Sequence, residues 1–297
     1  MIQSPLLSTL RKQNSLVINS ERLRVDIATP GTLYSGSRYD WTAFITQITL
    51  DDRVTFCAPE AIDGSGSGGI GLCSEFGIES AVGFDEAALG EHFVKPGVGL
   101  LERVDELPYD FARPYRITPF DVATELRDGE ILFISEPKGC RGYSLRTMRT
   151  VRVESSDVIV ESLIENVGSR RINTTEYCHN FIAINGRNPG KGTRLRLSES
   201  APSINRCSGL QVTGSAIYWQ QELTETFYAK FDGCFPSWWE LVDTDLGVAV
   251  SEEVDFEPDG FALFATKRTT SPEIFIRIDL MPGKRCQWKR RFKFGTV

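Results

Sequence analysis

Apolar and polar residues alternate along most of this 297-residue chain. Alternation with a period of two is typical of half-buried β-strands, and these stretches are rich in β-branched and aromatic residues. Turn-forming pairs such as Asp51-Asp52, Asp128-Gly129 and Pro282-Gly283 separate them. The predicted strands include 16–27, 41–50, 54–57, 131–135, 145–154, 158–164, 194–197, 216–219, 247–250, 274–280 and 287–294. Only 85–91 is compatible with a turn of helix, so the pattern predicts an all-β fold, a large antiparallel sandwich or barrel.

No shift in composition marks a linker, and we therefore treat residues 1–297 as one domain. The stretch 63–71 is glycine-rich and contains a formal G-x-G-x-x-G at Gly64, Gly66 and Gly69. A dinucleotide site needs that motif between a strand and a long helix, and no helical pattern follows it here. We interpret the stretch as a surface loop, near a ligand or not.

Charge argues against nucleic acid as a partner. The chain has 33 Lys and Arg against 40 Asp and Glu, a net charge of −7, whereas nucleic-acid binding needs a basic face. One basic run, 284–291, alternates with Trp288, which favours the solvent face of a strand.

Three features that the sequence lacks indicate the cellular compartment of the protein: a membrane helix, a signal peptide and paired cysteines. No apolar run reaches the ~18 residues of a membrane helix, and 1–7 lacks the basic and apolar regions of a signal peptide. The seven cysteines, 57, 73, 140, 178, 207, 234 and 286, form no C-x-x-C pair. We expect reduced thiols and a cytoplasmic protein without membrane association.

Histidine is scarce, since His92 and His179 are the only two. A three-histidine zinc site is impossible, and a two-histidine site with a carboxylate would use both. We expect no metal. Proton transfer needs only one histidine.

The segment around His179 is the most informative. Residues 151–168 predict a hairpin with a turn at 155–157, followed by a second turn at 166–169. In the next strand Tyr177, His179 and Phe181 share one face and Cys178 the other, which excludes a Cys178–His179 dyad. A histidine among aromatic residues is more often a hydrogen-bonded core residue than a catalyst.

The order of several segments resembles the galactose mutarotase-like (aldose 1-epimerase) superfamily, in particular uncharacterised bacterial members. The central segment carries N-x-G and then I-x-T-x-x-Y-x-H-N-F, ending with His179, Asn180 and Phe181. Similar segments in matching order are 35–50, 55–60, 90–101, 271–273 and 278–284. The similarity thus spans about 15–295, although the N-x-L-H-G-G and G-R-x-x-N-R runs are absent.

This resemblance implies a galactose mutarotase-like supersandwich with a sugar pocket on a concave sheet. It also implies an isomerase that interconverts α and β anomers of a sugar or sugar derivative without a cofactor. Ring opening needs a base for the anomeric hydroxyl and an acid for the ring oxygen. By resemblance His179 is the acid and Glu273 the base. A solvated carboxylate at a strand start is the alternative for Glu273.

Further sugar ligands are weaker predictions. Arg38 and Asp40, two residues apart on an expected strand, suggest an ion pair that shapes the pocket or holds a hydroxyl. The other candidates are His92, Lys95, Asn180, Asp232 and Trp238. Structural ion pairing, surface placement and core packing are the competing interpretations for these residues.

Two other functions stay open at this point. A carbohydrate-binding or sensor protein on the same fold would keep the pocket without catalysis. A lyase or hydrolase on this fold is the third alternative, and a glycosidase would need a second carboxylate beside Glu273. The sequence leaves the sugar, its C6 substituent, the anomeric preference and the oligomeric state open.

Overall fold

The computed structural model describes residues 14–61, 66–201 and 209–297. Those residues form strands and connecting turns, and the one helical element among them is a short 3-10 turn, η1 (Ile184–Gly186). The stretch 85–91 forms isolated turns, in which Ala87 N donates to Phe84 O and Glu91 N to Ala88 O. The prediction of an all-β fold is confirmed.

The first large sheet has nine strands and carries the His179 segment. Its antiparallel order is β1-β2-β3-β5-β13-β21-β20-β17, with β4 paired to β3. The strands are β1 (Ser15–Asn19), β2 (Leu23–Ala28), β3 (Ile45–Leu50), β4 (Val54–Thr55), β5 (Leu72–Phe76), β13 (Ile172–Asn180), β17 (Phe227–Phe231), β20 (Gly260–Ala265) and β21 (Thr270–Leu280).

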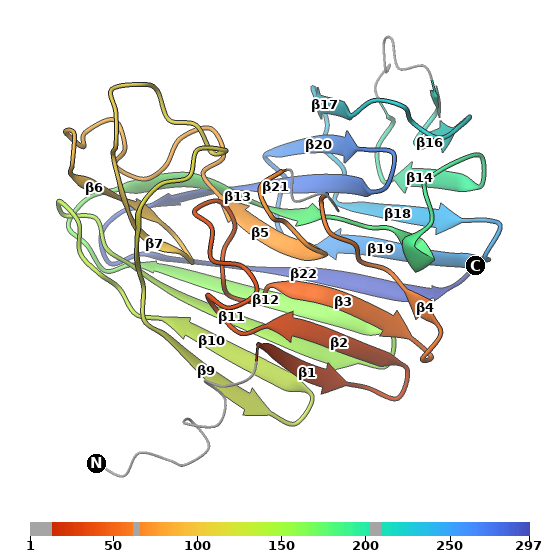
Figure 1. Cartoon of the computed structure of the whole chain (residues 1–297), viewed down its shortest axis with the longest axis horizontal. Coiled ribbons are helices and arrows are strands. Elements are labelled where there is room, and N and C mark those ends of the chain that lie inside the picture. Colours follow the sequence, from red (N-terminus) through yellow and green to blue (C-terminus); the bar gives the residue numbers. More distant parts are fainter. Residues whose placement is uncertain (1–13, 62–65, 202–208) are drawn as a thin grey trace.

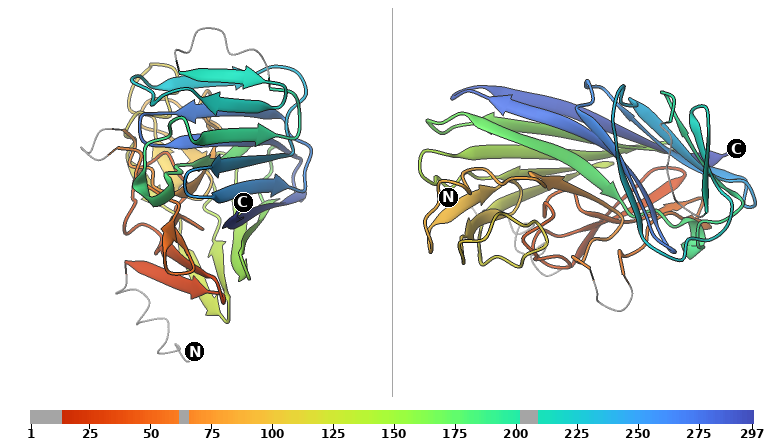
Figure 2. Two further views of the ribbon diagram at one scale, coloured as in Figure 1. Left: turned by 90° about the vertical axis from the view of Figure 1, so that its right-hand side faces the viewer. Right: turned by 90° about the horizontal axis from the view of Figure 1, so that it is seen from above.

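The second large sheet has ten strands in the order β15-β16-β14-β18-β19-β22-β12-β11-β10-β9. The strands are β9 (Val122–Arg127), β10 (Glu130–Ser135), β11 (Leu145–Glu154), β12 (Asp157–Asn166), β14 (Thr193–Leu197), β15 (Leu210–Thr213), β16 (Ala216–Trp219), β18 (Trp238–Asp243), β19 (Val248–Val254) and β22 (Arg285–Thr296). The two sheets lie face to face as layers (Figure 1; Figure 2).

A small third sheet lies at one end of the sandwich, while β14 and β16 lie at the other (Figure 1). It consists of β6 (His92–Lys95), β7 (Gly99–Glu102) and β8 (Ile117–Pro119). Phe93 of β6 packs edge to face with Phe84 and Tyr115, which lie in the segments before β6 and β8. Between β7 and β8 runs the loop 103–116, which carries Tyr109 and Phe111.

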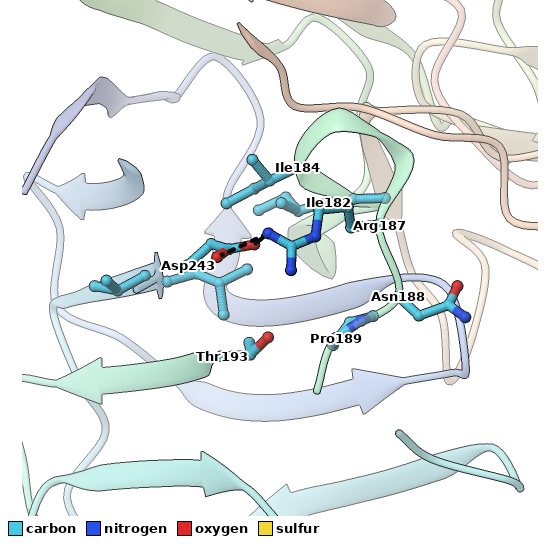
Figure 3. A pocket seen from close by; sticks show the side chains of 10 residues that line it. Ile182, Ile184, Arg187, Asn188, Pro189, Thr193 and Asp243 are labelled. Atoms are coloured by element: carbon cyan, nitrogen blue, oxygen red, sulfur yellow. Dashed lines mark hydrogen bonds and ion pairs between the residues drawn. The ribbon is translucent and has the colours of Figure 1, made fainter. Parts of the chain in front are cut away.

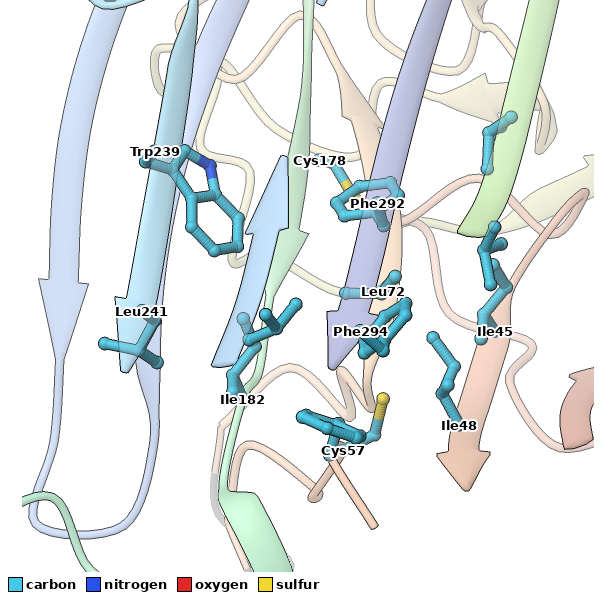
Figure 4. Close-up of a cluster of buried hydrophobic side chains, with 14 of the residues drawn as sticks. Ile45, Ile48, Cys57, Leu72, Cys178, Ile182, Trp239, Leu241, Phe292 and Phe294 are labelled. Atoms are coloured by element: carbon cyan, nitrogen blue, oxygen red, sulfur yellow. The ribbon is translucent and has the colours of Figure 1, made fainter. Parts of the chain in front are cut away.

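The main core fills the space between the large sheets. Ile45, Leu72 and Cys178 of the first sheet and Trp239 and Phe292 of the second belong to one buried cluster (Figure 4). Alternation explains its composition, because every second residue of a strand faces the opposite sheet. Burial of these apolar side chains is the main stabilising contribution to the fold.

The predicted hairpin and the turn after it are confirmed. Strands β11 and β12 pair from Leu145↔Asn166 to Glu154↔Asp157, and Ser155 has a positive φ of 52° in the turn. In the second turn Gly168 N donates to Asn166 Oδ1 at 3.0 Å. A Cβ on Gly168 would lie 2.4 Å from Gly142 O, so only glycine fits this crossing of two loops.

The predicted terminal strand over the basic run is also confirmed as part of β22, with one difference. Lys289 and Arg291 face outward beside Asp255 and Asp157. Arg290 falls on the inner face, where it is 1% exposed, because alternation places it between Trp288 and Phe292.

Six described cysteines, 57, 73, 140, 178, 234 and 286, are free thiols, and Cys207 lies outside the described residues. The prediction about 1–7 and the glycine stretch at 62–65 likewise fall on residues that are not described. Within the described part of the chain, no helix has the length and apolar character needed to cross a membrane.

Candidate functional site

Strand register places one row of side chains across the outer face of the first sheet. On β13, Cys178 points into the core, so Tyr177 and His179 point to the other side. Antiparallel partners share a face, and Tyr177 is paired with Glu75 of β5 and Phe275 of β21. The same reasoning adds Glu273 and Ser271, at i−2 and i−4 from Phe275, and Phe264, which is paired with Ser271.

These side chains form the floor of an open cleft with a volume of about 700 Å³. Its walls come from the small-sheet loop, the edge strand β17 and the loop before β5. The lining combines aromatic and charged side chains: Arg38, Glu60, Ser67, Ile78, Glu79, Tyr109, Asp110, Phe111, Tyr177, His179, Tyr228, Lys230, Phe264, Glu273 and Phe275. Apolar walls with a few convergent polar groups are typical of small-molecule sites.

His179 and Glu273 meet on this floor. His179 Nε2 lies 3.4 Å from Glu273 Oε1, and their side chains are 4% and 3% exposed. Ser271 Oγ bridges them from behind, 2.9 Å from both His179 Nδ1 and Glu273 Oε1. Phe181 stacks on the imidazole at a centroid distance of 3.9 Å, and Phe264 contacts it edge to face. The two groups therefore act on one point of the cleft and do not face each other across it.

Burial sets the protonation of this pair. Removal from water disfavours charge, and it raises the pKa of Glu273 to about 8, against smaller lowering effects of Ser271 and Arg38. The pKa of His179 lies well below its usual value because of burial and the nearby Arg38 charge. Near neutral pH both directions favour an uncharged pair, with a protonated carboxyl and a neutral imidazole. This is the reverse of the resting states that an acidic His179 and a basic Glu273 require.

Arg38 lines the cleft and is anchored to Glu75. Its Nε donates to Glu75 Oε2 at 2.8 Å, and its two terminal nitrogens donate to Ser67 Oγ and to the Tyr177 hydroxyl. Phe111 covers the guanidinium at 4.4 Å. Glu60 and Glu75 thus balance the charge of Arg38, whose hydrogen bonds hold the Tyr177 side of the floor in place.

Lys95 lies behind the cleft wall. It is fully buried, donates to Phe76 O and to the Tyr109 hydroxyl, and pairs with Glu75 Oε1 at 3.5 Å. Burial lowers the pKa of Lys95, while Glu75 opposes that shift. Its position supports Tyr109 in the cleft wall.

The interpretation that Arg38 and Asp40 form a pair on one strand is wrong. Both residues precede β3, and each has a different partner. Asp40 Oδ2 binds Arg149 of the second sheet at 3.1 Å, while Oδ1 accepts from Thr42 N. Because a Cβ on Gly97 would lie 2.0 Å from Asp40 Oδ1, that glycine gives the carboxylate its space.

Asp40 and Asn180 belong to a buried polar network between the sheets. Arg149 also binds Glu176, and Arg290 joins Glu176 to Glu252. Asn180 Nδ2 contacts Glu252 Oε2 at 3.4 Å and donates to Pro272 O at 2.6 Å, so its side chain faces away from the cleft. Alternation on β13, which separates Asn180 from His179, accounts for this placement.

His92, Asp232 and Trp238 do not line the described cleft. His92 is half-buried on β6, Asp232 is exposed just after β17, and Trp238 lies on β18 of the second sheet. Its neighbour Trp239 is fully buried and donates to Glu252 at 2.7 Å. In the part of the chain that is described, no group of three or more His, Cys, Asp and Glu side chains is arranged to hold a metal ion.

A second hollow lies beside η1, at the end of β13. Arg187 spans it and pairs with Asp243 at 3.3 Å (Figure 3). It also pairs with Asp245 at 3.1 Å. The inner part holds only about 20 Å³, and an adjoining open part about 410 Å³. Arg187, Asp243 and Asp245 are engaged in ion pairs with each other, and the described lining contains neither histidine nor an aromatic side chain.

Several residues of the site carry no local sequence pattern that indicates a role. Ser271 was visible only as part of the 271–273 segment, yet a period of two places it on the face of Glu273. Phe264, Phe275 and Tyr228 carried the ordinary signal of apolar strand residues. Glu75 and Tyr109 reach the site through strand pairing and a loop, for which no local pattern exists.

No protein-family model matches the sequence, and no curated protein matches it significantly. Solved structures do match. A galactose mutarotase-like protein from Lactobacillus casei ATCC 334 has a TM-score of 0.60 at 11% identity, covering 95% of this chain and 100% of that one. A galactose mutarotase related enzyme from Lactobacillus acidophilus also scores 0.60 at 11% identity, covering 95% and 97%. A GalM/aldose epimerase homologue from C. elegans scores 0.54 at 11% identity, covering 95% and 99%.

These likenesses extend over nearly the full length of each chain. The protein therefore has the galactose mutarotase-like fold, as the order of its sequence segments predicted. At 11% identity these comparisons establish the fold only. The reaction has to be inferred from the residues that line the cleft.

Proposed function

We propose that this protein binds a monosaccharide or sugar derivative in the aromatic cleft and interconverts its α and β anomers. The observation that carries the proposal is the contact between His179 and Glu273, one imidazole and one carboxyl 3.4 Å apart on the cleft floor. The fold shared with mutarotase-like proteins supports a sugar as the ligand.

Adjacent groups suit this reaction because the two reacting oxygens of an aldose are bonded to the same carbon. Glu273 gives its proton to the ring oxygen while His179 takes the proton of the anomeric hydroxyl. The C1–O5 bond breaks and a C1=O1 double bond forms. After rotation about C1–C2, His179 returns its proton to O1 and Glu273 recovers one from O5, so neither group is consumed.

The aromatic walls supply binding and orientation. Phe264, Phe275 and Tyr228 offer flat faces to the apolar side of a pyranose, and Arg38 offers remaining N–H donors to hydroxyls. Free thiols at the six described cysteines support the cytoplasm as the proposed location.

The test is exchange NMR between anomers for a panel of neutral, acidic and phosphorylated aldoses. We expect acceleration of at least one sugar and a loss of ~100-fold or more in His179→Ala and in Glu273→Gln. Glu253→Gln, an exposed carboxyl on the second sheet, is the matched control and should exchange at the wild-type rate. No acceleration of any sugar by the wild type would end the proposal.

A non-catalytic sugar-binding protein is the second candidate. One observation favours it: both ring nitrogens of His179 and Oε1 of Glu273 are already engaged with each other and with Ser271. This function predicts saturable sugar binding without exchange, and a larger loss of affinity for Phe264→Ala than for His179→Ala.

A further inference from the structure

Ser271 is the residue of the site that the proposed chemistry leaves without a role. It is fully buried on β21 and lies behind both His179 and Glu273. A buried hydroxyl that touches two proton-transfer groups limits where their protons can lie.

The proton inventory of this hydroxyl is closed. Asn180 N donates to Ser271 Oγ at 2.8 Å and uses one lone pair. The hydroxyl proton goes to Glu273 Oε1 at 2.9 Å, which leaves the proton of the neutral carboxyl on Oε2. The remaining lone pair faces His179 Nδ1 at 2.9 Å, and only an N–H can fill that contact.

We propose that Ser271 is a positioning residue that holds the fixed proton of His179 on Nδ1 and leaves Nε2 to exchange protons in the cleft. Nε2 is the nitrogen that lies 3.4 Å from Glu273 Oε1. The catalytic consequence rests on the proposed function, whereas the tautomer itself does not.

The same hydrogen bond orients the carboxyl. Ser271 holds Oε1, so Oε2 is left for a ligand, since it has no hydrogen-bond partner among the described residues. During ring opening the sugar hydroxyl proton moves to Nε2 and the carboxyl proton moves to the ring oxygen. Ser271 keeps its own proton throughout, and no other donor or acceptor is needed.

The scarcity of histidine makes the tautomer measurable. The protein labelled with 15N-histidine contains two imidazoles, and His92→Gln assigns the signals of His179. Long-range 1H–15N spectra distinguish a protonated ring nitrogen from a bare one. At a pH where the ring is neutral, we expect a protonated Nδ1 and a bare Nε2. A neutral ring with its proton on Nε2 would overturn the proposal.

Substitutions test whether Ser271 is the cause. In Ser271→Ala we expect the Nδ1–H form to lose its dominance, while Ser271→Thr, which keeps a hydroxyl, restores it. Thr270→Val is the matched control, because the neighbouring Thr270 hydroxyl is equally buried and has no partner among the described residues. An unchanged Nδ1–H tautomer in a folded Ser271→Ala protein would overturn the proposal. If that variant does not fold, the wild-type and Ser271→Thr spectra decide.

Kinetics separate this proposal from the function itself. If the wild type exchanges anomers, Ser271→Ala should lower kcat/KM about 10- to 100-fold, mainly through kcat, as is typical for residues that orient a reacting group. A loss of kcat/KM that comes from a rise in KM alone, with kcat unchanged, would contradict the positioning role. If the wild type exchanges no sugar, the proposed function fails, and the tautomer still decides the role of Ser271.

Discussion

His179 Nε2 lies 3.4 Å from Glu273 Oε1, and the two residues come from neighbouring strands of one sheet. The contact makes a single acid–base unit out of two buried groups, so their titrations are linked and apparent pKa values belong to the pair. Because burial opposes charge on both, the pair is most stable with one proton on the carboxyl and a neutral ring.

The first prediction concerns the pH dependence of anomer exchange. With Glu273 as proton donor, kcat/KM should fall on the alkaline side as the carboxyl ionises, with an apparent pKa near about 8. It should also fall in acid, below the usual range of histidine, where His179 becomes protonated. Exchange rates between pH 4 and 10 measure this profile.

An ionised Glu273 acting as base would give the opposite alkaline limb, a rate that rises toward pH 8. Charges that face the pair are Arg38, which lowers both pKa values, and Glu75 and Glu252, which raise that of Glu273. Glu253→Gln should leave the profile unchanged, because this exposed carboxyl points away from the core on the second sheet and is not among these charges.

The second prediction concerns stability. A carboxyl whose pKa is raised in the folded state keeps its proton up to about pH 8, whereas the unfolded chain releases it near 4.5. The folded state then binds more protons between these values, so stability falls as pH rises through this window. Glu273→Gln removes the penalty and should gain about 2–5 kcal/mol relative to wild type on going from pH 5 to pH 9.

Urea unfolding followed by tryptophan fluorescence measures that difference. Glu253→Gln, at an exposed carboxyl, is the matched control for the substitution itself. A stability difference between Glu273→Gln and wild type that does not change with pH would contradict the prediction.

The third prediction concerns Arg38 and Glu75. Because Glu75 is fully buried, Arg38→Met removes its closest cation and leaves the carboxylate with Lys95 at 3.5 Å, which should cost about 3 kcal/mol of unfolding free energy. In a double-mutant cycle, Arg38→Met with Glu75→Gln should be less destabilised than the sum of the single changes.

The control for this buried ion pair is the surface pair of Arg24 and Asp26 on β2, in which the arginine side chain is 49% exposed. Arg24→Met should cost less than about 1 kcal/mol, as is usual for surface ion pairs. Additive effects at Arg38 and Glu75 would show that the two residues are not coupled.

The features of the fold and the site that the sequence predicts are those that depend on residues close together in the chain. Period-two alternation is local, so it predicted the strands, the β11–β12 hairpin and the shared face of Tyr177 and His179. Chain order and the His179 and Glu273 segments predicted the sandwich. Neither signal reports which strands are neighbours, and Glu75 enters the site only through β5–β13 pairing.

Electrostatic partners were the least predictable feature. Arg38 and Asp40 are two residues apart, yet one binds Glu75 on the outer face and the other binds Arg149 between the sheets. Arg290 looked like part of a solvated basic run but is buried between Glu176 and Glu252. Charge alone does not show burial, because a paired charge can occupy a core position.

The last prediction concerns which aromatic residues contact the sugar. Phe264 lines the cleft and packs edge to face against the His179 ring, with 5.2 Å between the two ring centroids. Phe264→Leu should therefore weaken sugar binding about 10-fold, because a flat apolar face is lost. Trp238 lies on the other sheet, and Trp238→Phe should leave affinity unchanged. Isothermal titration with the sugar that exchanges fastest measures both. An equal loss of affinity in both variants would contradict the placement of the sugar on the β13–β21–β20 face, because one bound pyranose cannot contact side chains from both of these positions.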